Sequence, residues 1–315
     1  MKQIAPDYYD NFKCIASACK HNCCIGWEID IDEYTMDYYN AVEGEFGDRL
    51  KKHISLEGDA PHFCMGENER CPFLNEKNLC DIISTLGEDA LCDICADHPR
   101  FRNYFSDREE IGLGLCCESA GQLILGRTEK TYLTCIYDDG ENEMLTEEEK
   151  EILILREKAF NLIQNREKGI ADRIKDVYAL IGMEKKEIKK DEWVDLFLSM
   201  ERLDEAWTEL LLKIKSTPIN EKCRSEKELE TAFEQLLWYF IYRQFSLSAE
   251  DGRVRERLVF AVQSAELIML LCDFHKTAYG SLNLSDIVEY SRMYSSEMEY
   301  SAENVEKYLD FALNN

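Results

Sequence analysis

Long apolar runs are missing from this sequence of 315 residues. The first residues, MKQIAPDYYDNFKC, lack the apolar stretch of a secretory signal peptide. Charged residues interrupt the other apolar stretches well before they reach the length of a membrane span. The most apolar one, AELIMLLCDF from Ala265 to Phe274, is typical of a buried core helix. We therefore expect a soluble, cytoplasmic protein with no membrane partner.

Basic residues are also in short supply. The chain has 37 Lys and Arg against 63 Asp and Glu, which gives a net charge of −26. Such a surface repels phosphate backbones, so nucleic acid is excluded as a partner. The charge suits a basic, lysine-bearing protein partner, although an acidic surface that serves only solubility gives the same composition.

Histidine is scarce, with 5 residues beside 14 cysteines. A nucleophilic cysteine usually needs a histidine base, so this ratio disfavours a catalytic thiol. Disulfides are disfavoured as well, because no export signal precedes the cysteines and the cytosol keeps thiols reduced. Clustered thiolates in a reducing compartment usually hold metal.

Two common signatures of S-adenosylmethionine chemistry are absent. The radical motif CxxxCxxC begins correctly from Cys19 to Cys23, but Gly26 stands where its third cysteine would be. The stretch IGLGLCC contains Gly112 and Gly114, yet no helix is expected at the right distance after it. The doubly wound α/β pattern of the familiar methyltransferases is therefore not predicted anywhere.

Two regions of different composition meet near residue 140. Twelve of the cysteines lie at or before Cys135, together with frequent glycine and turn residues, whereas helical periodicity dominates afterwards. The sequence predicts a mainly α protein. Residues 1–140 form a loop-rich cysteine-cluster domain with short strands and hairpins, and residues 141–315 form an all-α helical domain.

Local patterns predict the individual elements. Trp27–Ile31 alternates like a short strand, and the N-terminal region also shows helices over 32–42 and 87–98 and hairpins over 71–83 and 100–117. In the second region, Thr146 with Glu149 and Ser225 with Glu228 are capping-box signals. Residues 191–214 and 253–274 are each long enough for a helix of several turns.

The cysteine spacing favours a metal site that a fold must assemble. Thiolates are soft ligands that suit iron–sulfur clusters and zinc. The only CxxC is Cys92–Cys95, and the other intervals are loop-like, as in iron–sulfur and multinuclear sites. The adjacent pairs Cys23–Cys24 and Cys116–Cys117 either serve two centres or include packing residues. We expect four cysteines to be small buried hydrophobes: Cys64, Cys135, Cys223 and Cys272.

Several stretches resemble the flagellin lysine N-methylase family of bacteria: CIASACKHNCCIGW, CPFLNEKNLCDI, LCDICADHPRF, LCCESAGQLIL, LFLSMERLDEAWTELL and FEQLLWYFIYRQF. The N-terminal part is also similar to a wider cysteine-cluster family of zinc- or iron-chelating domains. The resemblance implies methyl transfer from S-adenosylmethionine to lysine ε-amines of a flagellin-like protein. Proline is expected after the cysteine matching Cys117, but CCES has Glu118 there, which puts the local loop shape in question.

The resemblance also implies a ligand set for the metal. Matched position by position, the ligands are Cys14, Cys19, Cys23, Cys24, Cys71, Cys80, Cys95 and Cys117, with Cys92 as a ninth candidate. A 4Fe–4S iron–sulfur cluster is favoured over zinc. Two alternatives stay open: a non-catalytic metalloprotein with structural zinc, and an iron–sulfur redox protein.

Polar methyl transfer needs a group that orients the lysine amine and accepts its proton. The candidates are acidic residues beside the cysteines or inside apolar helical stretches: Glu118, Glu201, Asp204 and Glu234. The alternative for those in the helices is a solvated face, or a salt bridge between helices to Arg202 or Arg243.

Overall fold

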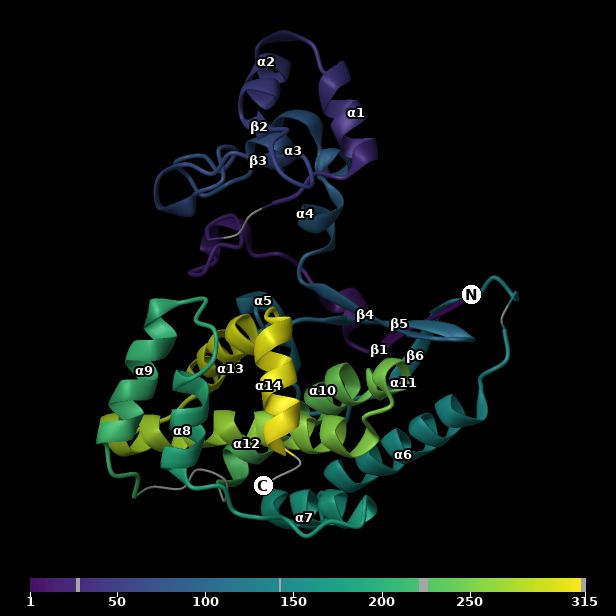
Figure 1. Cartoon of the computed structure of the whole chain (residues 1–315), viewed down its shortest axis with the longest axis vertical. Helices are drawn as coiled ribbons and strands as arrows, with labels where there is room; N and C mark the ends of the chain where they lie inside the picture. The colour runs from purple at the N-terminus through teal and green to yellow at the C-terminus, as the bar shows by residue number, and fades with distance from the viewer. Residues whose placement is uncertain (27–28, 142, 221–225, 313–315) are drawn as a thin grey trace. The chain divides into compact units, whose positions relative to one another are not determined.

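A computed structural model describes residues 1–26, 29–141, 143–220 and 226–312. The chain divides into two compact units (Figure 1). The helical unit combines Met1–Phe12 with Phe101–Asn315, and the cysteine unit is Lys13–Arg100. We expected a cysteine-cluster domain over residues 1–140. The cysteine unit is shorter, because residues 1–12 and 101–140 belong to the helical unit. Each unit is described by itself below.

A four-stranded sheet begins the helical unit. Its strand order is β4-β5-β1-β6, with β1 parallel to β5 and antiparallel to β6. Strands β4 and β5 are the hairpin expected over 100–117, whereas β1 and β6 were not predicted. The strands are β1 (Lys2–Pro6), β4 (Arg100–Phe105), β5 (Arg108–Leu113) and β6 (Leu133–Tyr137).

Helices make up the rest of this unit, as expected. They are α5 (Glu118–Leu125), α6 (Glu147–Ile163), α7 (Ile170–Leu180), α8 (Lys190–Leu198), α9 (Glu205–Ser216), α10 (Lys227–Phe240), α11 (Ser248–Asp251), α12 (Val254–Tyr279), α13 (Leu284–Met298) and α14 (Ala302–Ala312). A π-helical turn, Ile241–Phe245, continues α10. Helix α12 packs against α10, α13 and α14 (Figure 1).

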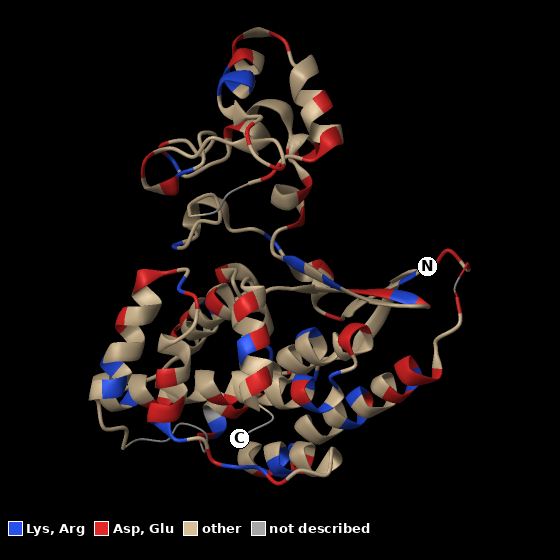
Figure 2. Ribbon diagram, in the orientation of Figure 1, with Lys and Arg blue, Asp and Glu red and all other residues tan. Residues whose placement is uncertain are grey.

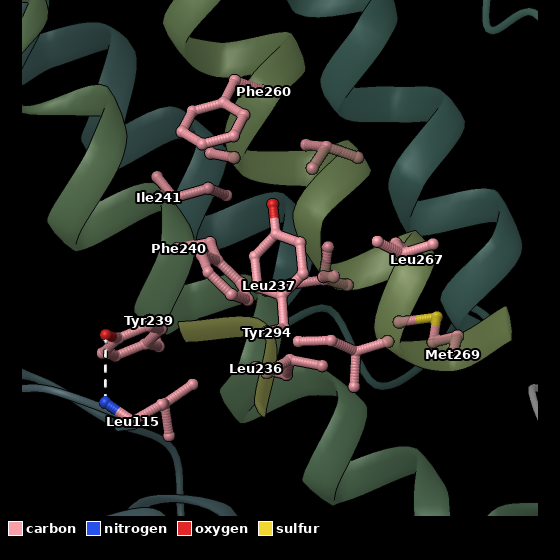
Figure 3. Packing of buried hydrophobic residues seen from close by; sticks show 14 of the residues in the cluster. Leu115, Leu236, Leu237, Tyr239, Phe240, Ile241, Phe260, Leu267, Met269 and Tyr294 are labelled. Carbon is pink, nitrogen blue, oxygen red and sulfur yellow. Dashed lines mark hydrogen bonds between the residues drawn. The ribbon is translucent and has the colours of Figure 1, made fainter. Parts of the chain in front are cut away.

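The core of the helical unit is built on α10 and α12. Every residue from Ala232 to Ser246 is buried, so α10 from Ala232 onward and its π-helical turn are enclosed on all sides. Phe240 and Leu237 of this segment pack with Tyr294 of α13 (Figure 3). Helix α12 is long and apolar enough to cross a membrane, but 89 % of its most apolar window is buried inside the protein. The prediction of a core helix over Ala265–Phe274 is therefore confirmed.

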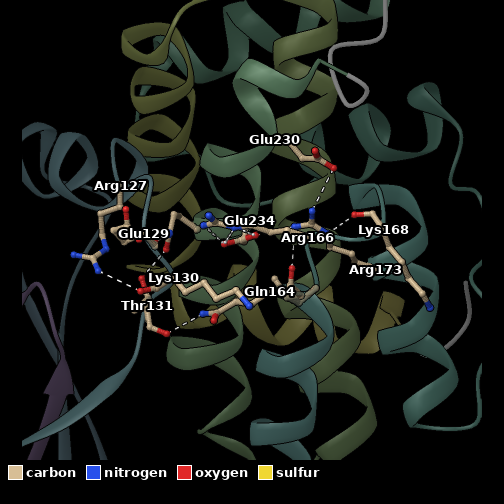
Figure 4. Close-up of polar contacts among 12 residues, drawn as sticks. Arg127, Glu129, Lys130, Thr131, Gln164, Arg166, Lys168, Arg173, Glu230 and Glu234 are labelled. Atoms are coloured by element: carbon tan, nitrogen blue, oxygen red, sulfur yellow. Dashed lines mark hydrogen bonds and ion pairs between the residues drawn. The ribbon is translucent and has the colours of Figure 1, made fainter.

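Charged groups inside this core are paired. Glu110 of β5 is fully buried, and its carboxylate oxygens accept hydrogen bonds of 2.5 and 2.7 Å from Arg156 of α6. Glu234 of α10 is 1 % exposed and accepts from Arg166 at 2.7 Å and from Arg173 of α7 at 2.8 Å (Figure 4). These ion pairs hold α6 and α7 against the buried segment.

Two sequence expectations for the helices have mixed outcomes. The capping box of Thr146 and Glu149 is confirmed at the start of α6. Ser225 lies outside the described residues. The single helix expected over 191–214 is wrong, because α8 ends at Leu198 and α9 starts anew at Glu205. The Asp204 carboxylate caps α9 by accepting from Ala206 N at 2.9 Å.

Short elements joined by turns form the cysteine unit. They are α1 (Glu33–Ala41), α2 (Gly44–Lys52), β2 (Ile54–Ser55), β3 (His62–Phe63), α3 (Asp81–Leu86) and α4 (Asp93–Asp97). Its core is a separate apolar cluster around Tyr39, Phe63 and Phe73. Two of the cysteines, Cys71 and Cys92, are buried in that cluster.

The elements predicted for this unit occur at the expected positions, but most of them are shorter than predicted. The helix over 32–42 is confirmed as α1. Ile29 and Ile31 are both buried, but Asp30 makes only an isolated bridge to His62, and Trp27 lies outside the described residues. The hairpin over 71–83 keeps its turn but is reduced to a single bridge between Leu74 and Cys80. The helix over 87–98 is only α4, preceded by a 3-10 turn over Glu88–Ala90.

The glycine at position 112 is required by packing, and the charged residues are widely distributed. Gly112 lies in β5, where an added Cβ would meet the Phe101 ring at 2.3 Å, so its missing side chain makes room for that ring. Asp and Glu residues are spread over both units, with Lys and Arg among them (Figure 2).

Replacing Glu234 by alanine is expected to destabilise the protein by about 3–5 kcal/mol, because Arg173, which is 1 % exposed, would lose its buried counter-charge. Chemical denaturation of both proteins measures this. Glu209→Ala on the exposed face of α9 is the control and should change stability by less than about 0.5 kcal/mol. Equal stabilities of the Glu234 and Glu209 variants would contradict the structural role of the pair.

Candidate metal centre

Six cysteines interact with one another inside the cysteine unit. The thiols of Cys23 and Cys24 shift each other's pKa, and so do those of Cys92 and Cys95. Electrostatic interactions join the two pairs to each other and to the remaining two. The six are Cys23, Cys24, Cys71, Cys80, Cys92 and Cys95, and we call them the thiol cluster.

Backbone contacts bring these distant positions together. Cys71 N donates to Cys24 O at 2.9 Å, which joins the first cysteine motif to the second. The bridge from Leu74 to Cys80 then closes the tight turn that returns the chain. Cys80 stands immediately before α3, so the turn fixes where that helix begins.

The third cysteine motif is positioned by Asp32. Its Oδ1 accepts from Thr35 N at 2.8 Å and caps α1, while its Oδ2 accepts from Asp93 N at 2.9 Å, the first residue of α4. Burial alone would raise the pKa of Asp32, but these N–H donors outweigh it and hold the pKa below its usual value. The Asp32 carboxylate thus fixes the first turns of both α1 and α4, and α4 begins directly after Cys92.

Proton affinities differ within the thiol cluster. The hydrogen bond from Cys24 lowers the pKa of Cys23 to about 7 and raises that of Cys24. The same arrangement lowers the pKa of Cys92 and raises that of Cys95. Burial raises the pKa of Cys71 to about 11. Each pair therefore has one sulfur that readily becomes a thiolate.

The adjacent cysteines 23 and 24 differ in exposure. Cys23 is exposed, whereas Cys24 is half-buried against the core of the unit. Because consecutive side chains usually diverge, we expected the two to point to different places. The two thiols nevertheless influence each other's pKa, so their sulfurs lie near each other.

Three other predicted ligands have different surroundings. Cys14 is exposed and its sulfur accepts from Ala16 N at 3.4 Å, while Cys19 Sγ contacts His21 O at 3.3 Å. Cys117 belongs to the helical unit, where it stands immediately before α5. Glu118 is the first residue of that helix and is half-buried. The neighbouring Cys116 is buried and contacts Tyr300 Oη at 2.9 Å.

The cysteines expected to pack in the core divide into two groups. Cys272 is fully buried in α12, as predicted. Cys64 and Cys135 are exposed, so that prediction is wrong for them: Cys135 lies on an exposed strand, where its thiol donates to Tyr137 O. Cys223 lies outside the described residues.

Convergence on a single ion is not seen. Among the described residues, no group of three or more Cys, His, Asp or Glu side chains has the arrangement that holds a metal ion. The six thiols of the cluster thus lie near one another, but their side chains are not arranged around a single ion.

Two of the four candidate carboxylates have structural partners. Glu234 forms a salt bridge between helices, as the alternative interpretation expected, but to Arg166 and Arg173. Arg243 pairs with Glu299 instead, at 3.1 Å. Asp204 caps α9.

Glu201 lines a pocket that the sequence did not reveal. The pocket has a volume of about 420 Å³ and is formed by the end of α8, the start of α9 and the segment between them, residues 199–204. Sequence reasoning missed it because it treated this segment as the middle of one continuous helix. The break at Ser199, together with a capping Asp204 before Glu205, was the available signal.

Comparison with known proteins gives the relationship of the chain. It is 31 % identical over 136 residues to the flagellar biosynthetic protein FliU of Salmonella muenchen, and the match covers 79 % of that protein and 40 % of this chain. The chain belongs to the flagellin lysine N-methylase family. Lysine-N-methylases of Salmonella typhimurium and Salmonella choleraesuis are each 32 % identical over 136 residues.

The chain spans about a third of the length of these two lysine-N-methylases, since the match covers 33 % of each and 40 % of this chain. No protein-family model and no solved structure matches the chain. The positions of the cysteines described above therefore come from this structure and not from a related one.

Replacing Asp32 by alanine should destabilise the protein by about 1–2 kcal/mol at neutral pH, because a helix cap is lost. The pKa of Asp32 is lowered in the folded state, so its stabilisation is present above the unfolded value of ~3.9 and disappears as the pH falls through the folded value. Denaturation of wild type and variant between neutral and acid pH measures the difference. Asp37→Ala, exposed on the same helix, is the control, and a pH-independent difference for Asp32 would contradict the assignment.

Proposed function

We propose that this chain is a metal-dependent protein lysine N-methyltransferase that uses S-adenosylmethionine and acts on a flagellin-like protein. Family membership supports the lysine methylation, because the relatives carry the names lysine-N-methylase and flagellar biosynthetic protein FliU. The acidic chain, with a net charge of −26, suits a substrate that presents lysines. The observation that supports the metal is the thiol cluster.

The donor set of the thiol cluster fits an iron–sulfur cluster or zinc. Thiolates are the soft ligands that these centres use, and two of the six sulfurs have lowered pKa values. Cys24, Cys71, Cys80, Cys92 and Cys95 are the residues that would hold the metal, with Cys23, Cys14 and Cys19 as further proposed ligands; Cys117 belongs to the helical unit and stays a prediction from the family resemblance. A bound centre would brace the unit and supply a Lewis acid.

The transfer itself sets requirements on the protein. The neutral lysine nitrogen attacks the methyl carbon, the carbon–sulfur bond of the donor breaks, and the nitrogen loses a proton. Because the ordinary pKa of lysine is ~10.4, a nearby group must accept that proton. Glu118, beside a proposed ligand, and Glu201, at the pocket between α8 and α9, are the proposed proton acceptors, whereas Glu234 is held in buried ion pairs and Asp204 caps α9.

A purely structural metal is the second candidate. The cysteine unit contains only short helices and two-residue strands around a small core, and such units often depend on a metal to fold. A colourless preparation that contains zinc and transfers no methyl group would favour this alternative. A brown preparation that contains iron and sulfide would favour an iron–sulfur centre.

Methyl transfer is tested with anaerobically purified protein, S-adenosylmethionine carrying a labelled methyl group, and flagellin. We expect label on lysine side chains, found by mass spectrometry of flagellin peptides. Flagellin with chemically blocked lysines is the control. Metal-loaded protein that leaves flagellin unlabelled would contradict the proposed activity.

Metal content is tested with single cysteine variants purified without oxygen. Cys71→Ser and Cys80→Ser should lose most of the bound iron or zinc and lower the thermal unfolding temperature, because each removes a ligand from the thiol cluster. Cys64→Ser is a matched control, since Cys64 is exposed in the same unit. Unchanged metal content in both cluster variants would remove them from the ligand set.

A further inference from the structure

The pocket of the helical unit has charged and aromatic walls. Its volume is about 420 Å³, within the usual range for small-molecule sites. Phe197 and Trp207 come from α8 and α9, and Met200, Glu201 and Arg202 come from the segment between these helices. Thr208 adds a hydroxyl.

Buried polar groups hold the segment between α8 and α9 in one conformation. Asn304 accepts from Glu201 N at 2.8 Å and donates to Glu201 O at 3.0 Å. The Glu297 carboxylate accepts from Leu203 N at 3.0 Å and from Asp204 N at 2.5 Å. Both Asn304 and Glu297 are 1 % exposed. Such anchoring preorganises exposed side chains for binding.

The two charged side chains of the pocket are differently engaged. Glu201 Oε2 accepts from Ser301 Oγ at 2.7 Å, which orients the carboxylate and leaves Oε1 for another donor. Arg202 makes no hydrogen bond or salt bridge within the described part of the chain, although its charge opposes the rise that burial causes in the pKa of Glu297. A carboxylate and a guanidinium therefore stand on consecutive residues at the same pocket, next to an apolar wall.

We propose that this pocket binds the head group of a free α-amino acid whose side chain is large. The α-ammonium pairs with Glu201 and the α-carboxylate pairs with Arg202. The side chain lies against Leu198 and Met200, above the buried rings of Phe197 and Trp207. Guanidinium groups bind carboxylates in a two-pronged geometry, so Arg202 selects for the second charge. A lysine side chain of a protein lacks that carboxylate, and Arg202 would repel its ammonium. In this assignment Glu201 holds the α-ammonium of the ligand, which leaves Glu118 as the candidate acceptor of the lysine proton.

The inference rests on the proposed function in one respect: the methionine portion of S-adenosylmethionine, the proposed donor, has this head group. The probe is S-adenosylhomocysteine, which keeps the head group but has no methyl group to transfer. Binding to the full chain is measured by titration calorimetry, independently of methyl transfer and of metal content.

Glu201→Gln and Arg202→Met are each expected to weaken binding of S-adenosylhomocysteine about tenfold, as loss of a charge-assisted hydrogen bond does. Gln at 201 still accepts the hydrogen bond from Ser301. Glu209→Gln and Arg255→Met, both exposed on α9 and α12, are controls that should bind like wild type. Circular dichroism melts confirm that all four variants fold.

Three outcomes overturn the assignment: no binding to wild type, equal binding by wild type and both pocket variants, or tight binding of N-acetyl-lysine methylamide that only Glu201→Gln weakens. The last result would make the pocket an amine site. The failures of the two proposals are distinguishable. Binding that depends on Glu201 and Arg202 without any methyl transfer keeps the pocket, whereas methyl transfer with unaffected binding in both variants refutes it.

Discussion

The enclosure of the segment Ala232–Ser246, most of α10 and its π-helical turn, is the constraint on which the helical unit depends. A segment buried from Ala232 to Ser246 cannot leave its polar side chains without partners, because each would lose its hydration and gain nothing. The partners come from different elements: Glu234 takes arginines on two sides, Gln235 meets Thr131 at 2.7 Å, and Gln244 meets Glu299 at 2.9 Å. These polar contacts fix the register of the elements around the apolar core.

The same network extends to the loop that carries Cys117. Tyr239 Oη accepts from Leu115 N at 3.2 Å and donates to Glu299 at 2.8 Å, while Arg243 donates to Tyr239 Oη at 2.9 Å. Missing proline after Cys117 raised doubt about the shape of this loop. The buried Tyr239, itself held by Arg243, anchors this loop at Leu115, so the loop does not need a proline to define its shape.

Sequence patterns correctly predicted the elements that depend on residues close together in the sequence. The Thr146–Glu149 cap, helix α1 and the core helix α12 depend on neighbouring residues and on periodicity, and all three are present. Strand β1 was missed because its partners, β5 and β6, lie more than a hundred residues away in the sequence. The partners of Glu234 were misassigned for the same reason. For the thiol cluster, residue type indicated all six sulfurs, but only the fold shows that they lie near one another while Cys64 is exposed outside the cluster.

Strand β1 has a consequence for the order of assembly during synthesis. Its two neighbours in the sheet emerge from the ribosome only after the whole stretch Lys13–Arg100 has been made. The first residues must therefore wait without their strand partners while the cysteine unit, an insertion between β1 and the rest of the helical unit, is synthesised. The cysteine unit can thus fold on the nascent chain before β1 pairs with β5 and β6 and closes the sheet across the insertion.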